Sequence, residues 1–124
     1  MNHNEPDVKL LILFGSRARG TQGRISDTDV AVLADRPLTV RDKGVIAEQV
    51  APTLHVSEDE IDIVDLQSAS PLLQYHVAEE GKLLRGNTFD FTRFKVLAWK
   101  RYLDTARFRK ARHESLKRHV ARIH

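Results

Sequence analysis

The chain has 124 residues, 41% of them hydrophobic, which suffices for a single domain with one core. It contains no cysteine, which excludes a disulfide framework, and its polar N-terminus and the short apolar run that follows argue against a signal sequence or a membrane span. The net charge of +3 describes neither part of the chain, because residues 1–84 carry 8 basic and 14 acidic side chains and residues 85–124 carry 12 and 3.

The first predicted element is a buried strand that ends at a glycine and a serine. Residues 8–14 are apolar apart from Lys9, and this run has the length of a single buried strand. Gly15 allows the backbone to approach a phosphate closely, and Ser16 offers a hydroxyl and can cap a short helix whose amides attract anions. Since ligand sites lie at such strand ends, the pair predicts a phosphate-binding turn.

A basic loop joins this turn to two aspartates at the start of the second strand. Arg17, Arg19 and Arg24 are either solubilising loop residues or phosphate ligands, and we expect Arg17, the nearest to the turn, to contact phosphate. Asp27 and Asp29 are two residues apart, so in an extended chain both carboxylates project the same way, as a magnesium site requires. The alternative is an ordinary polar turn.

The middle of the chain predicts alternating strands and helices. The expected elements are a strand at 29–33, a helix at 39–54 with Pro52 as its stop, a strand at 60–66, a helix from Ser70 and Pro71 to Gly81, and a strand at 82–85. This order predicts an α/β or α+β sandwich in which helices cover a small sheet.

A third acidic candidate, Asp62, lies in the strand predicted at 60–66, where apolar and acidic residues alternate. If this strand neighbours the one that follows Asp27 and Asp29, Asp62 completes a three-carboxylate cluster of the kind that metal-assisted nucleotidyl transfer uses. Otherwise Asp62 is one more solvated charge at an edge strand, like Asp65.

From Asp90 onward the chain predicts a helix with one apolar side. That side consists of Phe91, Phe94, Ala98, Tyr102 and Ala106. The excess of basic residues on this helix predicts a solvated face or a surface that binds an acidic protein face or RNA, and the imbalance of sign favours a binding surface. RNA is the less favoured partner.

Four other side chains of this helix could suggest special roles. We expect Trp99 to be a core or interface residue, since nothing around it indicates a base-stacking platform. His113, His119 and His124 lack the spacing of a metal site, and we expect them at the surface.

Three segments resemble the minimal nucleotidyltransferase family, the small members of the polymerase-beta-like superfamily: Leu13 to Gly20, Ser26 to Leu33 and Ile61 to Leu66. The resemblance implies a mixed sheet flanked by helices. Gly15 and Ser16 would hold the β- and γ-phosphates of ATP. Asp27 and Asp29 would hold two magnesium ions, and Asp62 would complete one metal site and help to activate the attacking hydroxyl. We expect one domain, with a catalytic core at about 8–86 and a helical segment at about 88–124.

Members of this family are typically antitoxins encoded beside a helical toxin of the HEPN ribonuclease class. The resemblance implies that the chain forms a complex with such a toxin and transfers AMP from ATP to a tyrosine hydroxyl near the active site of the toxin. We therefore expect a cytoplasmic protein in which a hydroxyl attacks the α-phosphorus of ATP and pyrophosphate leaves. Many relatives carry a helix before the first strand, whereas only Met1 to Asp7 precede it here. One flank of the sheet is then covered either by the chain itself or by a partner.

Three other functions stay open on the sequence. The chain could be an antitoxin that only binds the toxin through its basic helix, with a vestigial nucleotide site. It could be the catalytic half of a small-molecule nucleotidyltransferase, although it has little room for an acceptor-binding domain. A nucleic-acid-binding module is the weakest alternative, and steep salt dependence of RNA binding would support it.

Overall fold

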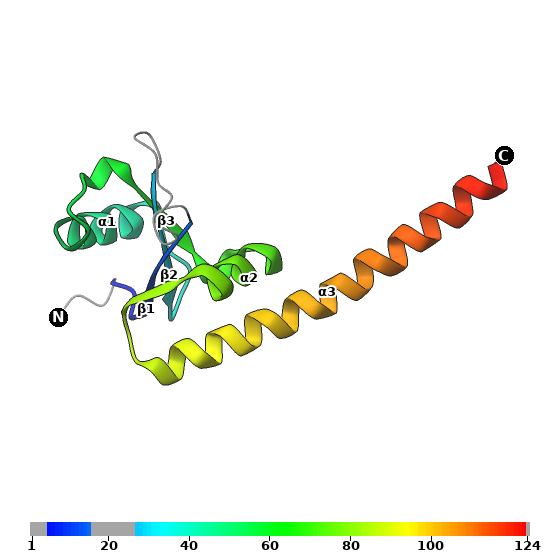
Figure 1. Cartoon of the computed structure of the whole chain (residues 1–124). Coiled ribbons are helices and arrows are strands. Elements are labelled where there is room, and N and C mark those ends of the chain that lie inside the picture. The colour runs from blue at the N-terminus through cyan, green and yellow to red at the C-terminus, as the bar shows by residue number, and fades with distance from the viewer. Residues whose placement is uncertain (1–4, 16–26, 124) are drawn as a thin grey trace.

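The computed structural model describes residues 5–15 and 27–123, which form a four-stranded sheet and three α-helices (Figure 1). The strands are β1 (Val8–Phe14), β2 (Thr28–Ala34), β3 (Ile61–Asp65) and β4 (Lys82–Arg85). The α-helices are α1 (Val40–Leu54), α2 (Pro71–Glu80) and α3 (Thr88–Ile123), and two short 3-10 helices, Glu58–Glu60 and Leu66–Ser68, flank β3. The predicted elements are confirmed, most of them within two residues at each end.

The sheet has the strand order β3-β2-β1-β4 and is mixed. β1 pairs antiparallel with β2 and β4, whereas β2 pairs parallel with β3. The connection between the two parallel strands contains α1, as a parallel crossover requires. The α/β class and the mixed sheet implied by the family resemblance are therefore confirmed.

Helices of the chain itself cover both faces of the sheet (Figure 1). On one face, buried side chains of α1 pack on those of β1, β2 and β3. On the other, α2 and α3 pack on β1 and β2. The chain itself therefore covers both flanks of the sheet, with α1 on one face and α2 with α3 on the other.

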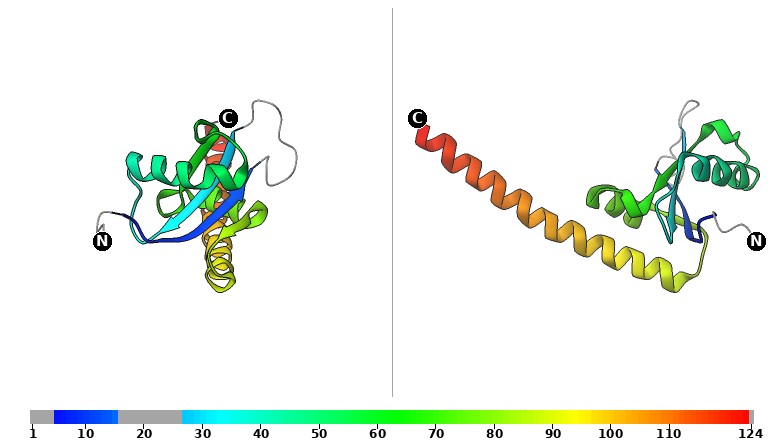
Figure 2. Two further views of the ribbon diagram at one scale, coloured as in Figure 1. Left: turned by 90° about the vertical axis from the view of Figure 1, so that its left-hand side faces the viewer. Right: turned by 180° about the vertical axis from the view of Figure 1, so that it is seen from behind.

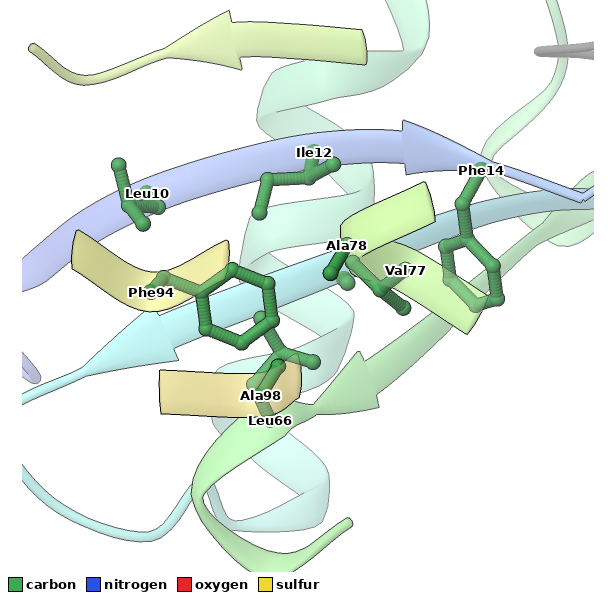
Figure 3. Packing of buried hydrophobic residues seen from close by; sticks show 9 residues of the cluster. Leu10, Ile12, Phe14, Leu66, Val77, Ala78, Phe94 and Ala98 are labelled. Carbon is green, nitrogen blue, oxygen red and sulfur yellow. The ribbon is translucent and has the colours of Figure 1, made fainter. Parts of the chain in front are cut away.

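The cluster beneath α2 and α3 is drawn in Figure 3. Leu10 and Ile12 of β1 are fully buried there, and they pack with Val77 of α2 and with Phe94 and Ala98 of α3. Burial of each large apolar side chain contributes about 2 kcal/mol to the free energy of unfolding. The apolar side predicted for the last helix is therefore the side that anchors it.

Capping residues set the start of α1. Thr39 and Asp42 form a capping box, in which the Asp42 amide donates to Thr39 Oγ1 over 3.1 Å and the Thr39 amide donates to Asp42 Oδ2 over 2.8 Å. Arg36 donates to the same carboxylate over 2.7 Å, and this bond is the main reason that the pKa of Asp42 falls to about 2. The helix ends at Leu54 as predicted, two residues after Pro52, where His55 adopts a left-handed conformation with φ 56°.

The start of α2 follows the prediction, and one side of the helix packs on the sheet. Ser70 accepts a hydrogen bond from the Leu73 amide, and Pro71 occupies the first turn. The side chains of Leu72 and His76 in this helix are exposed. The sheet lies against the side of the helix that carries Val77.

The last helix, α3, is the longest element, and its C-terminal half extends away from the rest of the molecule (Figure 2). Its last contacts with the core include Tyr102, whose ring stacks on that of Tyr75 with centroids 4.1 Å apart. His113 and His119 are exposed as predicted, whereas His124 lies outside the described residues. Within the described ranges, no helix combines the length and the apolar character that crossing a membrane would need.

Candidate active site

The parallel pairing of β2 and β3 brings two of the predicted site residues side by side. Asp29 and Asp62 are register partners in this pair, and Asp29 is also the partner of Phe14 in β1. Side chains of register partners point to the same face of a sheet, so the two carboxylates share the face on which Phe14 packs. The strand that carries Asp62 therefore neighbours the one that carries Asp29, as the cluster hypothesis requires.

The turn after β1 lies against this pair. Gly15 has φ +78°, a left-handed conformation that glycine adopts most readily. A Cβ added at Gly15 would collide with Oδ2 of Asp29. The backbone conformation therefore favours glycine at this position, and any side chain here would also displace the carboxylate of Asp29.

The acidic residues differ in burial. Asp29 is half-buried, whereas Asp62 and Asp27 are exposed, and Thr28 between the two aspartates of the turn is buried. Partial burial raises the pKa of Asp29, and the negative charges of Asp62 and Asp27 raise it further. The carboxylate of Asp29 is thus held in a place where its own negative charge is unfavourable.

Such a site suits a hard divalent cation. Magnesium binds one or two carboxylates and completes its octahedral shell with substrate phosphates and waters, so the pair formed by Asp29 and Asp62 offers a suitable donor set. Among residues 5–15 and 27–123, no group of three or more acidic or histidine side chains could hold a metal ion by itself. These carboxylates therefore suit a magnesium ion whose coordination shell is completed by the phosphates of a bound nucleotide.

The other predicted ligands of the nucleotide cannot be located in the same way. Ser16 and Arg17 lie outside the described residues, as do Arg19 and Arg24. Their assignment to the triphosphate stays a prediction from the sequence.

The remaining acid of β3, Asp65, has a structural role. Its carboxylate accepts hydrogen bonds from the Leu38 amide over 2.9 Å, from the Gln67 amide over 3.1 Å and from the Ser68 hydroxyl over 3.2 Å. The expectation that Asp65 is a solvated charge is therefore wrong, because it ties the segment before α1 to the end of β3. The pattern of aspartate and serine three residues apart was the signal for such a cap.

A cavity of about 560 Å³ lies away from these carboxylates. It is lined by the N-terminal segment, by one side of α1 and by Arg85 of β4. Val8 at the start of β1 borders it, whereas Gly15 follows the other end of that strand. Its location separates it from the phosphate turn and from Asp29.

Comparisons with known proteins agree with this geometry. Residues 1–89 match the family described as polymerase beta, nucleotidyltransferase. A protein of Shewanella oneidensis named protein adenylyltransferase MntA is 40% identical over 77% of this chain and 67% of its own length. A protein of the same name from Aphanizomenon flos-aquae is 37% identical over 74% of this chain and 68% of its own length.

Solved structures show the same fold over nearly the whole chain. A toxin-antitoxin crystal structure with AMP-PNP has a TM-score of 0.74 and 36% identity, and the match covers 92% of this chain and 90% of the other. A complex of a tri-AMPylated Shewanella oneidensis HEPN toxin with its MNT antitoxin has a TM-score of 0.67 and 31% identity, over 94% and 89% of the two chains. The sheet sets Asp29 beside Asp62, the Gly15 turn lies against them, and the sequence and structure matches agree with this arrangement. The chain therefore belongs to the polymerase beta nucleotidyltransferase family.

Proposed function

We propose that this chain is an antitoxin that transfers AMP from ATP to a tyrosine hydroxyl of a HEPN-class toxin and so neutralises it. The observation that carries the proposal is the juxtaposition of Asp29 and Asp62 beside the Gly15 turn. The relatives named protein adenylyltransferase and the AMPylated toxin in a similar complex support the reaction and its acceptor. The similar structure with AMP-PNP supports ATP as the substrate.

In this proposal the carboxylates hold magnesium and the turn holds the triphosphate. Asp27 and Asp29 would hold two ions, and Asp62 would complete the shell of one of them. Bound magnesium lowers the pKa of the attacking hydroxyl and stabilises the leaving oxygen. Gly15 would bring backbone amides close to the phosphates, and Ser16 and Arg17 would add a hydroxyl and a guanidinium.

The proposed step is an in-line displacement at the α-phosphorus. A bond forms between the tyrosine oxygen and the phosphorus, the bond to the bridging oxygen breaks, and pyrophosphate leaves with that oxygen. The tyrosine proton passes to Asp62, whose exposed carboxylate is open to the acceptor side. The turn keeps the triphosphate still, so most of the rate enhancement comes from positioning and charge.

The catalytic core and the last helix belong to one domain in this proposal. We propose that residues 8–86 form the catalytic core and 88–124 the helical segment of one domain, since Phe94 and Ala98 pack into the same cluster as β1. We also propose that the reaction takes place in the cytoplasm, where ATP and magnesium are available.

The test is to incubate the chain with labelled ATP, magnesium and the purified toxin, followed by intact mass analysis and peptide mapping of the toxin. The wild-type chain should add AMP to a tyrosine of the toxin, and chelation of magnesium should stop the reaction. Asp29→Asn should abolish the transfer, whereas Asp59→Asn, a change at an exposed acid in the turn before β3, should not. Neutralisation of the toxin in cells by Asp29→Asn would favour the binding-only antitoxin instead.

A further inference from the structure

The helix α3 carries a second apolar surface on the side opposite its anchor. We call it the outer stripe, and its residues have exposed side chains, with exposed fractions of 75%, 52%, 39% and 61% for Phe89, Val96, Trp99 and Leu103. With 3.6 residues per turn, these four lie on one side of the helix, roughly opposite Phe94. Trp99, which the sequence left as a core or interface residue, therefore belongs to a surface.

The spacing of the outer stripe is that of a helix-packing seam. Phe89, Val96 and Leu103 follow one another at intervals of seven residues, and Trp99 lies three residues after Val96. This is the a and d pattern by which one helix packs against another. Exposed apolar residues that line up in this way mark an interaction site more often than a solvated face.

The charges beside the outer stripe indicate what kind of partner it accepts. Arg93, Lys100 and Arg107 are exposed and repeat at the same interval of seven, each four residues after one of the three stripe residues that share this interval. In a pair of packed helices, residues at this position face charged residues of the partner and select it by sign. The complementary helix should carry acidic residues beside an apolar ridge.

A second copy of this chain does not meet that requirement. Two α3 helices packed along their outer stripes in antiparallel orientation would bring Arg93, Lys100 and Arg107 of one copy against the same row of the other. In parallel orientation Lys100 would face Lys95 of the other copy, and like charges at these positions are unfavourable. RNA would match the positive charges, but it offers no apolar surface on which the aliphatic side chains of Val96 and Leu103 could be buried.

We infer that the outer stripe of α3 is a docking surface for an amphipathic helix of the toxin, with aspartate and glutamate beside an apolar ridge. The identity of the partner rests on the proposed function. Phe14 shares its face of the sheet with Asp29 and Asp62, and Phe14 lies in the same buried cluster as Phe94 of α3. The helix that carries the outer stripe thus packs on the face of the sheet to which the carboxylates point.

The test measures binding without catalysis. The full chain is titrated calorimetrically with purified, nuclease-treated toxin in the absence of ATP, as wild type and as the double variant Val96→Asp/Leu103→Asp. The matched control is Phe108→Asp, since Phe108 is 79% exposed on the same helix but five residues after Leu103, on another side. The double variant should bind at least ~30-fold more weakly, the control should bind within ~2-fold of wild type, and added salt should weaken wild-type binding.

The outcomes separate the docking surface from the reaction. If the wild type binds the toxin in this titration but adds no AMP to it in the separate assay with labelled ATP and magnesium, the proposed function is contradicted, while loss of binding in the double variant would still support the docking surface. Unchanged binding in the double variant, or no binding of the toxin by the wild type, would overturn the inference. It would also be overturned if the wild type alone formed a dimer that the double variant does not form, or if toxin binding required RNA.

Discussion

Replacement of Asp29 by asparagine should stabilise the metal-free protein while it abolishes AMP transfer. Asp29 is half-buried beside its register partner Asp62 and two residues after Asp27. Burial and the two neighbouring charges raise its pKa, so its ionised form is unfavourable in the folded protein. Asparagine keeps nearly the same shape and removes the charge.

The size of the effect follows from the geometry of the sheet. Neighbouring strands lie about 4.8 Å apart, and carboxylates at about 6 Å repel by about 0.7 kcal/mol in water and about 2.8 kcal/mol at an effective dielectric constant near 20. Asp62 and Asp27 are exposed, so solvent screening favours the lower part of this range. We expect the free energy of unfolding to rise by about 1 kcal/mol, or roughly 3–5 °C in Tm for a domain of this size.

The effect should depend on pH with a definite sign. Because the pKa of Asp29 is raised above 3.8 in the folded state, the folded protein binds this proton more tightly than the unfolded chain does. The free energy of unfolding therefore falls as the pH rises from 3.8 through the folded pKa. The variant lacks this loss, so its advantage should be absent below pH 3.8 and complete above the folded pKa of Asp29.

The assay combines thermal unfolding with transfer. Melting of wild type, Asp29→Asn and the control Asp59→Asn is followed by circular dichroism at several pH values in the presence of a chelator, and again with magnesium and AMP-PNP. Magnesium with nucleotide should raise the Tm of the wild type and of the control more than that of Asp29→Asn. If Asp29→Asn melts below the wild type at neutral pH without metal, or still transfers AMP, the electrostatic reasoning about this site is refuted.

Three further predictions concern the turn, the first helix and the core. Gly15→Ala should abolish AMP transfer and lower the free energy of unfolding by about 1–3 kcal/mol, because alanine is strained at a left-handed φ and its Cβ would collide with the Asp29 carboxylate. A variant that transfers AMP and is as stable as the wild type in urea unfolding would contradict this prediction. In a carbon-13 NMR titration the carboxyl of Asp42 should show a pKa of about 2. Its contribution to the free energy of unfolding should be present above pH 3.8 and lost as the pH falls through about 2. Arg36→Gln should return this pKa toward 3.8, and an unchanged pKa would show that another group depresses it. Phe94→Ala should cost about 3–5 kcal/mol in urea unfolding, and a loss below about 1 kcal/mol would mean that α3 is not anchored by this side chain.

Local sequence signals predicted most of the elements because their causes lie within a few residues. The apolar run at 8–14 forms β1 with its predicted bounds, and Ser70 with Pro71 starts α2 where the capping pattern places it. Pro52 lies in the last turn of α1, where a proline removes only one hydrogen bond, so the helix continues for two residues to its left-handed cap at His55.

The sequence by itself determined the strands, the helices, the glycine turn and the presence of three candidate carboxylates. Only the tertiary structure decided that β3 runs parallel to β2 in the register that sets Asp62 beside Asp29, and that Asp65 instead ties down the segment before α1. It also decided that Trp99, which the sequence left as a core or interface residue, faces outward from α3. The reason is that strand pairing and helix docking depend on contacts between residues far apart in the chain, whereas caps, turns and periodicity depend on near neighbours.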